Sequence, residues 1–164
     1  KIPMILDGGP CKSGLESTII GFGENTLFLH RPGFITEEEL RSELPPDWNL
    51  VAEKQNKQKT PGSHHYHYAP HTPMTLVDNF DLLDLNDITD KVGSLSQNKK
   101  LPGASVCIIL SSDGTLEKAA EALYKALIEL DQMSLDHIYC ERFPDTGLGR
   151  TINERLEKAA NRLK

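Results

Sequence analysis

The segment from Val106 to Cys140 shows most clearly how this chain folds. It begins with the apolar run Val-Cys-Ile-Ile-Leu (residues 106–110), continues through LEKAAEALYKALIELDQM (residues 116–133) and ends with Ile-Tyr-Cys (residues 138–140). The apolar residues of the middle segment recur at the spacing of one helix face, whereas the flanking runs are short and β-type. This order predicts two parallel strands joined by a covering helix.

The same alternation continues on both sides of this unit. Another β-type run covers residues 74–77, and residues 152–163 carry apolar side chains on one helical face. The region 74–164 is therefore predicted to be a small Rossmann-like α/β domain with a mostly parallel sheet. We expect its two helices to cover both faces of that sheet.

The first 46 residues follow another pattern, in which short strands are separated by glycine turns and followed by one helix. The expected strands lie at residues 4–6, 17–22 and 26–31. Thr36 and Glu39 have the spacing of a capping box, which predicts a helix that Pro45-Pro46 ends. Residues 47–73 show no period and are rich in Lys, Gln, His, Tyr and Pro, so we expect an interdomain linker there.

The composition excludes several classes of protein. The 164 residues are 38% hydrophobic and 26% charged, as in globular proteins, and no apolar run approaches the roughly 20 residues of a membrane span. The net charge of −6 disfavours tight nucleic-acid binding, because a surface that follows phosphates is basic. Three widely spaced cysteines do not suggest a disulfide framework, and they favour a reducing cytoplasm.

Two motifs in the first region have both a functional and a purely structural interpretation. Residues 7–18 (DGGPCKSGLEST) carry glycines and hydroxyls that could hold a small polar ligand, although their composition favours a turn between strands. Arg31, at the end of a predicted strand and before Pro-Gly, could bind a phosphate or carboxylate with its forked guanidinium. It could equally be a solvated arginine at a turn, and both interpretations stay open.

Two further motifs lie later in the chain. Residues 60–71 contain four histidines and two tyrosines, which could form a metal site, a mobile lid or a plain polar linker. Lysines at 54, 57 and 59 would repel a cation and attract an anionic ligand, so a lid fits the residues better than a metal site. Residues 147–150 (GLGR) open a predicted helix whose amides could hold an anion, as a nucleotide-sensing regulatory module without catalysis would require.

In their order and spacing, these motifs resemble the two-domain L-threonylcarbamoyladenylate synthases. In this family a YrdC-type α/β catalytic domain is followed by a linker and a smaller carboxyl-terminal domain. The motifs that carry the resemblance are DGGPC (residues 7–11), GLESTII (14–20), RPGFITEE (31–38), HYAP (67–70), ALYKAL (122–127) and NERL (153–156). The resemblance implies that residues 1–46 end the YrdC-type domain, residues 47–73 form the linker and residues 74–164 form the last domain.

The resemblance implies a nucleotidyltransferase that converts L-threonine, bicarbonate and ATP, with Mg²⁺, to threonylcarbamoyl-AMP and pyrophosphate. The product would pass to a separate tRNA threonylcarbamoyl transferase in the cytoplasm for threonylcarbamoyladenosine formation. Neither tight tRNA binding nor a membrane is implied, and neither is a tightly bound cofactor. Nothing here matches the earlier half of the family's catalytic domain, so we expect this chain alone to be inactive.

The resemblance also implies roles for individual residues. Ser17 corresponds to the hydroxyl that contacts threonine, and Arg31 corresponds to a contact with the phosphates of ATP. No catalytic acid or base and no metal ligand is implied, because adenylation depends mainly on positioning and on neutralisation of phosphate charge.

The segment 61–70 corresponds to the linker that closes over the active site. His67 and Tyr68 belong to this expected lid. The family often has an aromatic residue at the position of His65, so the resemblance leaves open whether His65 or Tyr66 contacts the nucleotide.

Overall fold

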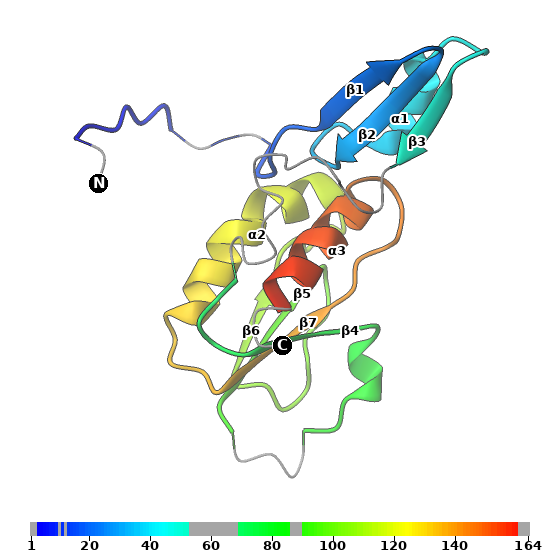
Figure 1. Cartoon of the computed structure of the whole chain (residues 1–164). Helices are drawn as coiled ribbons and strands as arrows, with labels where there is room; N and C mark the ends of the chain where they lie inside the picture. Colours follow the sequence, from blue (N-terminus) through cyan, green and yellow to red (C-terminus); the bar gives the residue numbers. More distant parts are fainter. Residues whose placement is uncertain (1–2, 10, 12, 53–68, 86–89, 161–164) are drawn as a thin grey trace.

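A computed structural model describes residues 3–9, 11, 13–52, 69–85 and 90–160 of the chain. It contains a three-stranded sheet of order β1-β2-β3 and a four-stranded sheet of order β4-β7-β5-β6 (Figure 1). No helix in this described part of the chain is long and apolar enough to cross a membrane. The α/β class predicted from the sequence is therefore confirmed.

The smaller sheet is built around a strand–helix–strand unit. Its elements are β1 (Ile19–Gly23), β2 (Thr26–Arg31), α1 (Glu37–Glu43) and β3 (Asn49–Ala52). β1 runs antiparallel to β2, and β3 runs parallel to β2, so α1 forms the crossover between two parallel strands. Leu27, Leu29 and Leu50 are buried on the face of the sheet against which Leu40 and Leu44 pack.

The capping box predicted at Thr36 is confirmed. The Thr36 hydroxyl accepts a hydrogen bond from the Glu39 amide at 3.2 Å, and the Glu39 carboxylate accepts one from the Thr36 amide at 2.7 Å. Two expectations for this region are wrong. Residues 4–6 form no strand, and Leu6 is 89% exposed. Residues 49–52, expected to belong to a linker without regular structure, form β3, because Leu50 is buried beside Leu27 in the parallel pair.

The larger sheet is parallel throughout, as the sequence predicts. Its strands are β4 (Met74–Val77), β5 (Val92–Ser96), β6 (Val106–Ile109) and β7 (His137–Glu141), and its helices are α2 (Leu116–Asp131), α3 (Gly147–Ala160) and the short 3₁₀ helix η1 (Phe80–Leu82). β5 was not predicted. Its sequence VGSLS has no apolar run, yet all five residues are buried because strands flank it on both sides.

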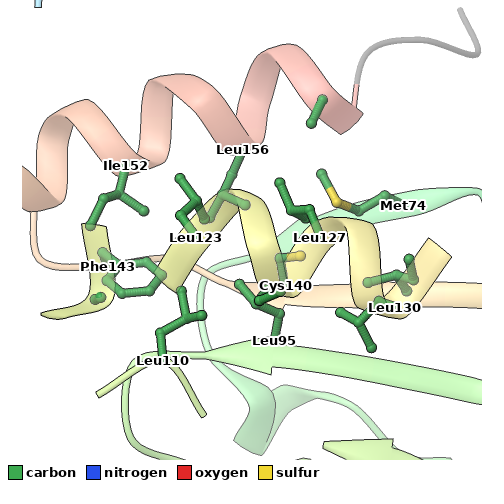
Figure 2. Close-up of a cluster of buried hydrophobic side chains, with 14 of the residues drawn as sticks. Met74, Leu95, Leu110, Leu123, Leu127, Leu130, Cys140, Phe143, Ile152 and Leu156 are labelled. Carbon is green, nitrogen blue, oxygen red and sulfur yellow. The ribbon is translucent and has the colours of Figure 1, made fainter. Parts of the chain in front are cut away.

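The main core lies between this sheet and two helices on one of its faces. Figure 2 shows Leu123 and Leu127 of α2 and Leu156 of α3 above Leu95 and Cys140 of the sheet. The expectation that the two helices cover opposite faces is therefore wrong. The connection from β4 to β5 occupies the other face, where Phe80, Leu85, Val92 and Leu101 form a second cluster. The β4–β5 connection runs along the sheet in the opposite direction to the β6–α2–β7 connection, and right-handed crossovers that run in opposite directions lie on opposite faces.

Candidate substrate-binding site

The structure brings together Ser17 and Arg31, the two substrate-binding residues predicted in the described part of the chain. Arg31 Nε and Nη2 donate to the Ser17 carbonyl at 3.1 and 2.7 Å, and Nη2 also donates to the Ser17 hydroxyl oxygen at 3.1 Å. Ser17 is exposed and Arg31 is partly buried. The pair thus places a hydroxyl and a guanidinium next to each other at the surface, where both could contact one polar ligand.

The hairpin of β1 and β2 creates this proximity. Ile19 is opposite Arg31 in the antiparallel pair, so the residues just before β1 lie beside the end of β2. The Phe34 amide then donates to the Glu16 carbonyl at 3.2 Å. Gly33 allows the two segments to approach this closely, because a Cβ at that position would lie 2.3 Å from the Thr18 nitrogen.

Polar side chains of α2 and α3, the helices that pack on the larger sheet, contact the residue just before Ser17, and the sequence patterns did not predict this role. Glu16 Oε2 accepts hydrogen bonds at 3.0 Å from both Arg155 Nε of α3 and the Tyr124 hydroxyl of α2. Burial opposes ionisation of Glu16, but the positive charge and hydrogen bond of Arg155, with the bond from Tyr124, outweigh it and lower the pKa of Glu16. The motifs NERL and ALYKAL contained both partners, but no local pattern links them to residue 16.

The turn at residues 147–150, considered as an anion site, is occupied by carboxylates of the chain itself. The Gly147 amide at the start of α3 donates to Glu38 Oε1 at 3.3 Å. Arg150 forms ion pairs with Glu37 at 3.1 Å and with Glu38 at 3.3 Å. The Glu38 carboxylate accepts hydrogen bonds from its own backbone amide and from that of Gly147, and these bonds, with the charge of Arg150, lower the pKa of Glu38. This geometry indicates that the turn joins α1 to α3, which disfavours the nucleotide-sensing hypothesis.

The predicted lid residues His65, Tyr66, His67 and Tyr68 lie outside the described residues. His71 Nδ1 lies 2.9 Å from Asp131 Oδ2, and the Thr72 amide donates to Asp131 Oδ1 at 2.9 Å. Burial opposes ionisation of Asp131, but these bonds from residues 71 and 72 outweigh it and lower its pKa to about 2.

The histidine motif was also considered as a metal site. Within the ranges that the structure describes, no three His, Cys, Asp or Glu side chains gather as metal ligands would. Of the four histidines in residues 60–71, only His71 belongs to these ranges.

A family model described as threonylcarbamoyl-AMP synthase, C-terminal domain, matches residues 35–161. The chain belongs to this family. The resemblance seen in the motifs is therefore confirmed, and the match covers α1, the larger sheet and the helices that pack on it.

Relatives and a solved structure extend the likeness of this synthase-family chain to its first residues. It is 34% identical to threonylcarbamoyl-AMP synthase of Bacillus subtilis (strain 168), over 98% of the chain and 49% of that protein. It is 30% identical to the enzyme of the same name from Pyrococcus abyssi, over 98% of the chain and 50% of that protein. The crystal structure of P. abyssi Sua5 complexed with L-threonine matches with a TM-score of 0.75 and 27% identity, covering 94% of this chain and 48% of the other. The chain thus spans about half the length of the relatives it matches.

Proposed function

We propose that this chain is part of a threonylcarbamoyl-AMP synthase, a nucleotidyltransferase that uses L-threonine, bicarbonate and ATP. The match to relatives of that name over 98% of the chain supports this activity for the whole protein. The pairing of Ser17 with Arg31 is the structural observation that carries the proposal, because it joins the two residues that the family motifs assign to the two substrates.

The chemistry follows from the substrates and the product. The amino group of threonine attacks the carbon of bicarbonate and water leaves, which gives a carbamate. A carbamate oxygen then attacks the α-phosphorus of ATP, a P–O–C linkage forms, and the bond to the leaving pyrophosphate breaks. The protein must hold two anions near each other, so positioning and charge neutralisation supply most of the acceleration.

Ser17 and Arg31 suit these two tasks. A hydroxyl that accepts a hydrogen bond from a guanidinium becomes a better donor, and the Ser17 hydroxyl would donate to the carboxylate of threonine. The Arg31 guanidinium would neutralise phosphate oxygens of ATP, which this group binds in a planar, charge-assisted geometry. Mg²⁺ would accompany ATP as part of the substrate.

Release of pyrophosphate by the whole synthase tests the proposal. It should require threonine, bicarbonate and ATP together, and omission of any one should abolish it. Arg31→Ala should lower kcat/KM for ATP by about 100-fold or more, as loss of a charge-assisted phosphate contact does. Ser17→Ala should raise KM for threonine by about tenfold, the effect of one hydrogen bond to a charged group. Pyrophosphate release that does not depend on threonine would refute the assignment.

We also propose that residues 61–70 close over the bound nucleotide, that His65 or Tyr66 contacts the nucleotide, and that His67 and Tyr68 belong to this lid. Tyr and His rings offer stacking faces, and the lysines upstream add positive potential near the phosphates. Replacement of residues 65–68 by a Gly/Ser segment should raise KM for ATP without changing the urea midpoint of unfolding. If turnover and KM for ATP stay at their wild-type values while Arg31→Ala abolishes activity, the segment is only a tether.

The product would pass to a separate cytoplasmic transferase that modifies tRNA. The net charge of −6 on this chain supports this division, because an acidic chain adds no general attraction to tRNA phosphates. A gel-shift titration with unmodified tRNA should show no binding by the purified synthase at physiological salt.

A further inference from the structure

We propose that Arg155, on helix α3 of the larger sheet, is a positioning residue that fixes the spacing of the predicted substrate-binding pair, Ser17 and Arg31. The inference rests on the proposed function, because it concerns how the same site is held. Arg155 lies on α3, outside the hairpin that carries the pair, and its side chain is only 5% exposed.

The two hydrogen bonds of Arg155 to the hairpin end on the residues that adjoin the pair. Its Nε donates to the carboxylate of Glu16 at 3.0 Å, and its Nη2 donates to the carbonyl of Pro32 at 2.9 Å. Glu16 immediately precedes Ser17, and Pro32 immediately follows Arg31. One planar guanidinium therefore bridges the segment just before β1 and the segment just after β2.

Neighbouring contacts hold both ends of this link. The Tyr124 hydroxyl donates to the same carboxylate oxygen of Glu16 at 3.0 Å, and the Thr151 hydroxyl donates to the Gly33 carbonyl at 3.3 Å. Glu154 forms an ion pair with Arg155 Nη1 at 3.1 Å. A buried guanidinium with several fixed partners has little freedom to move, so the position of the hairpin depends on the positions of α2 and α3.

Through this link, helix α3 has a direct effect on substrate binding. Without the link, Glu16 and Pro32 can move apart, and the spacing between the Ser17 hydroxyl and the Arg31 guanidinium changes with them. A hydrogen bond to a charged substrate group that loses its alignment weakens substrate binding by about tenfold. If Arg155 only held the hairpin and the helices together, its removal would lower the stability of the protein but would leave the substrate affinity of the folded molecules unchanged.

Steady-state kinetics of the whole synthase test the inference. Arg155→Met should raise KM for threonine and KM for ATP by about tenfold each, with kcat changed by less than about threefold, because the weakened step is binding. Arg155→Lys keeps the charge but cannot bridge both partners, so it should recover part of this loss. Arg142→Met is the matched control: it also removes an ion pair with α3, to Glu157, and should leave both KM values unchanged.

If Arg155→Met does not fold, Arg155→Lys and Glu16→Gln decide the question. Both should raise KM for the two substrates by about threefold or more, as loss of one oriented hydrogen bond does. Wild-type KM values in both variants would overturn the inference.

Hydrogen exchange of the same protein gives a readout that does not need activity. The Phe34 amide, which donates to the Glu16 carbonyl, should exchange at least about tenfold faster in Arg155→Lys than in wild type or Arg142→Met. If wild type makes no threonylcarbamoyl-AMP but the exchange difference is seen, the proposed function alone has failed. If wild type is active and the Arg155 variants match it in KM and exchange, the positioning role alone has failed.

Discussion

Replacement of Gly14 by alanine should separate the smaller sheet from the helices of the larger unit. Gly14 has φ +64°, and a Cβ there would lie 2.2 Å from Glu121 Cα and 2.3 Å from the Ala120 carbonyl oxygen of α2. Both are backbone atoms in the middle of a helix and cannot move aside without breaking it. The residue after it, Leu15, is buried in the main core, so its anchorage depends on this close approach.

The expected cost follows from two effects. A non-glycine residue in the left-handed region costs about 1–2 kcal/mol, and overpacking against fixed atoms costs about 1–3 kcal/mol. Together they give about 2–5 kcal/mol, of which the chain avoids part by releasing residues 14–15 from α2. With a urea slope of about 2 kcal/mol per molar, the transition of the smaller sheet should shift by about 1 M or more.

Urea unfolding followed by two probes measures this shift. Trp48, the single tryptophan, lies 6.3 Å from Phe22 between ring centroids, so its fluorescence follows the smaller sheet. Far-ultraviolet circular dichroism follows mainly α2 and α3. Gly9→Ala is the control, because Gly9 has φ +86° but no atom within 4 Å of an added Cβ. Equal fluorescence midpoints for Gly14→Ala and Gly9→Ala would refute the argument from close approach.

Three further results are expected. Leu123→Ala should lower the free energy of unfolding by about 3–5 kcal/mol in urea titrations, since Leu123 is fully buried between α2 and the sheet. Asp131 has a folded pKa of about 2, below its ordinary value of 3.8, because the bonds from residues 71–72 outweigh its burial. Its contribution to stability should be present above about pH 4 and lost as the pH falls to about 2, and Asp131→Asn should remove that part of a melting-temperature profile. A thiol reagent should label Cys11 quickly in the folded protein, since hydrogen bonds from the backbone of residues 13 and 14 lower its pKa and it is exposed. Cys140 should react only after unfolding, because complete burial raises its pKa.

Patterns of nearby residues predicted the features whose contacts are local. The helical spacing of residues 116–133 and the capping box at Thr36 specify helices because their contacts lie three or four residues apart. The short apolar runs at 74–77 and 106–110 predicted strands, and their alternation with helices predicted a parallel sheet. The ordered motifs also sufficed to identify the family, and they nominated Ser17 and Arg31.

How these parts meet depends on contacts between residues that are far apart in the sequence. β5 is a strand because two neighbours pair with it, although its own sequence contains no apolar run. The face that α2 covers depends on the direction of the β6–β7 crossover along the sheet, and α3 joins it there through the shared core; no local pattern records either. The bond between Arg155 and Glu16 joins residues 139 positions apart. Such contacts depend on the path of the whole chain, so the network behind the predicted site could be found only from the folded molecule.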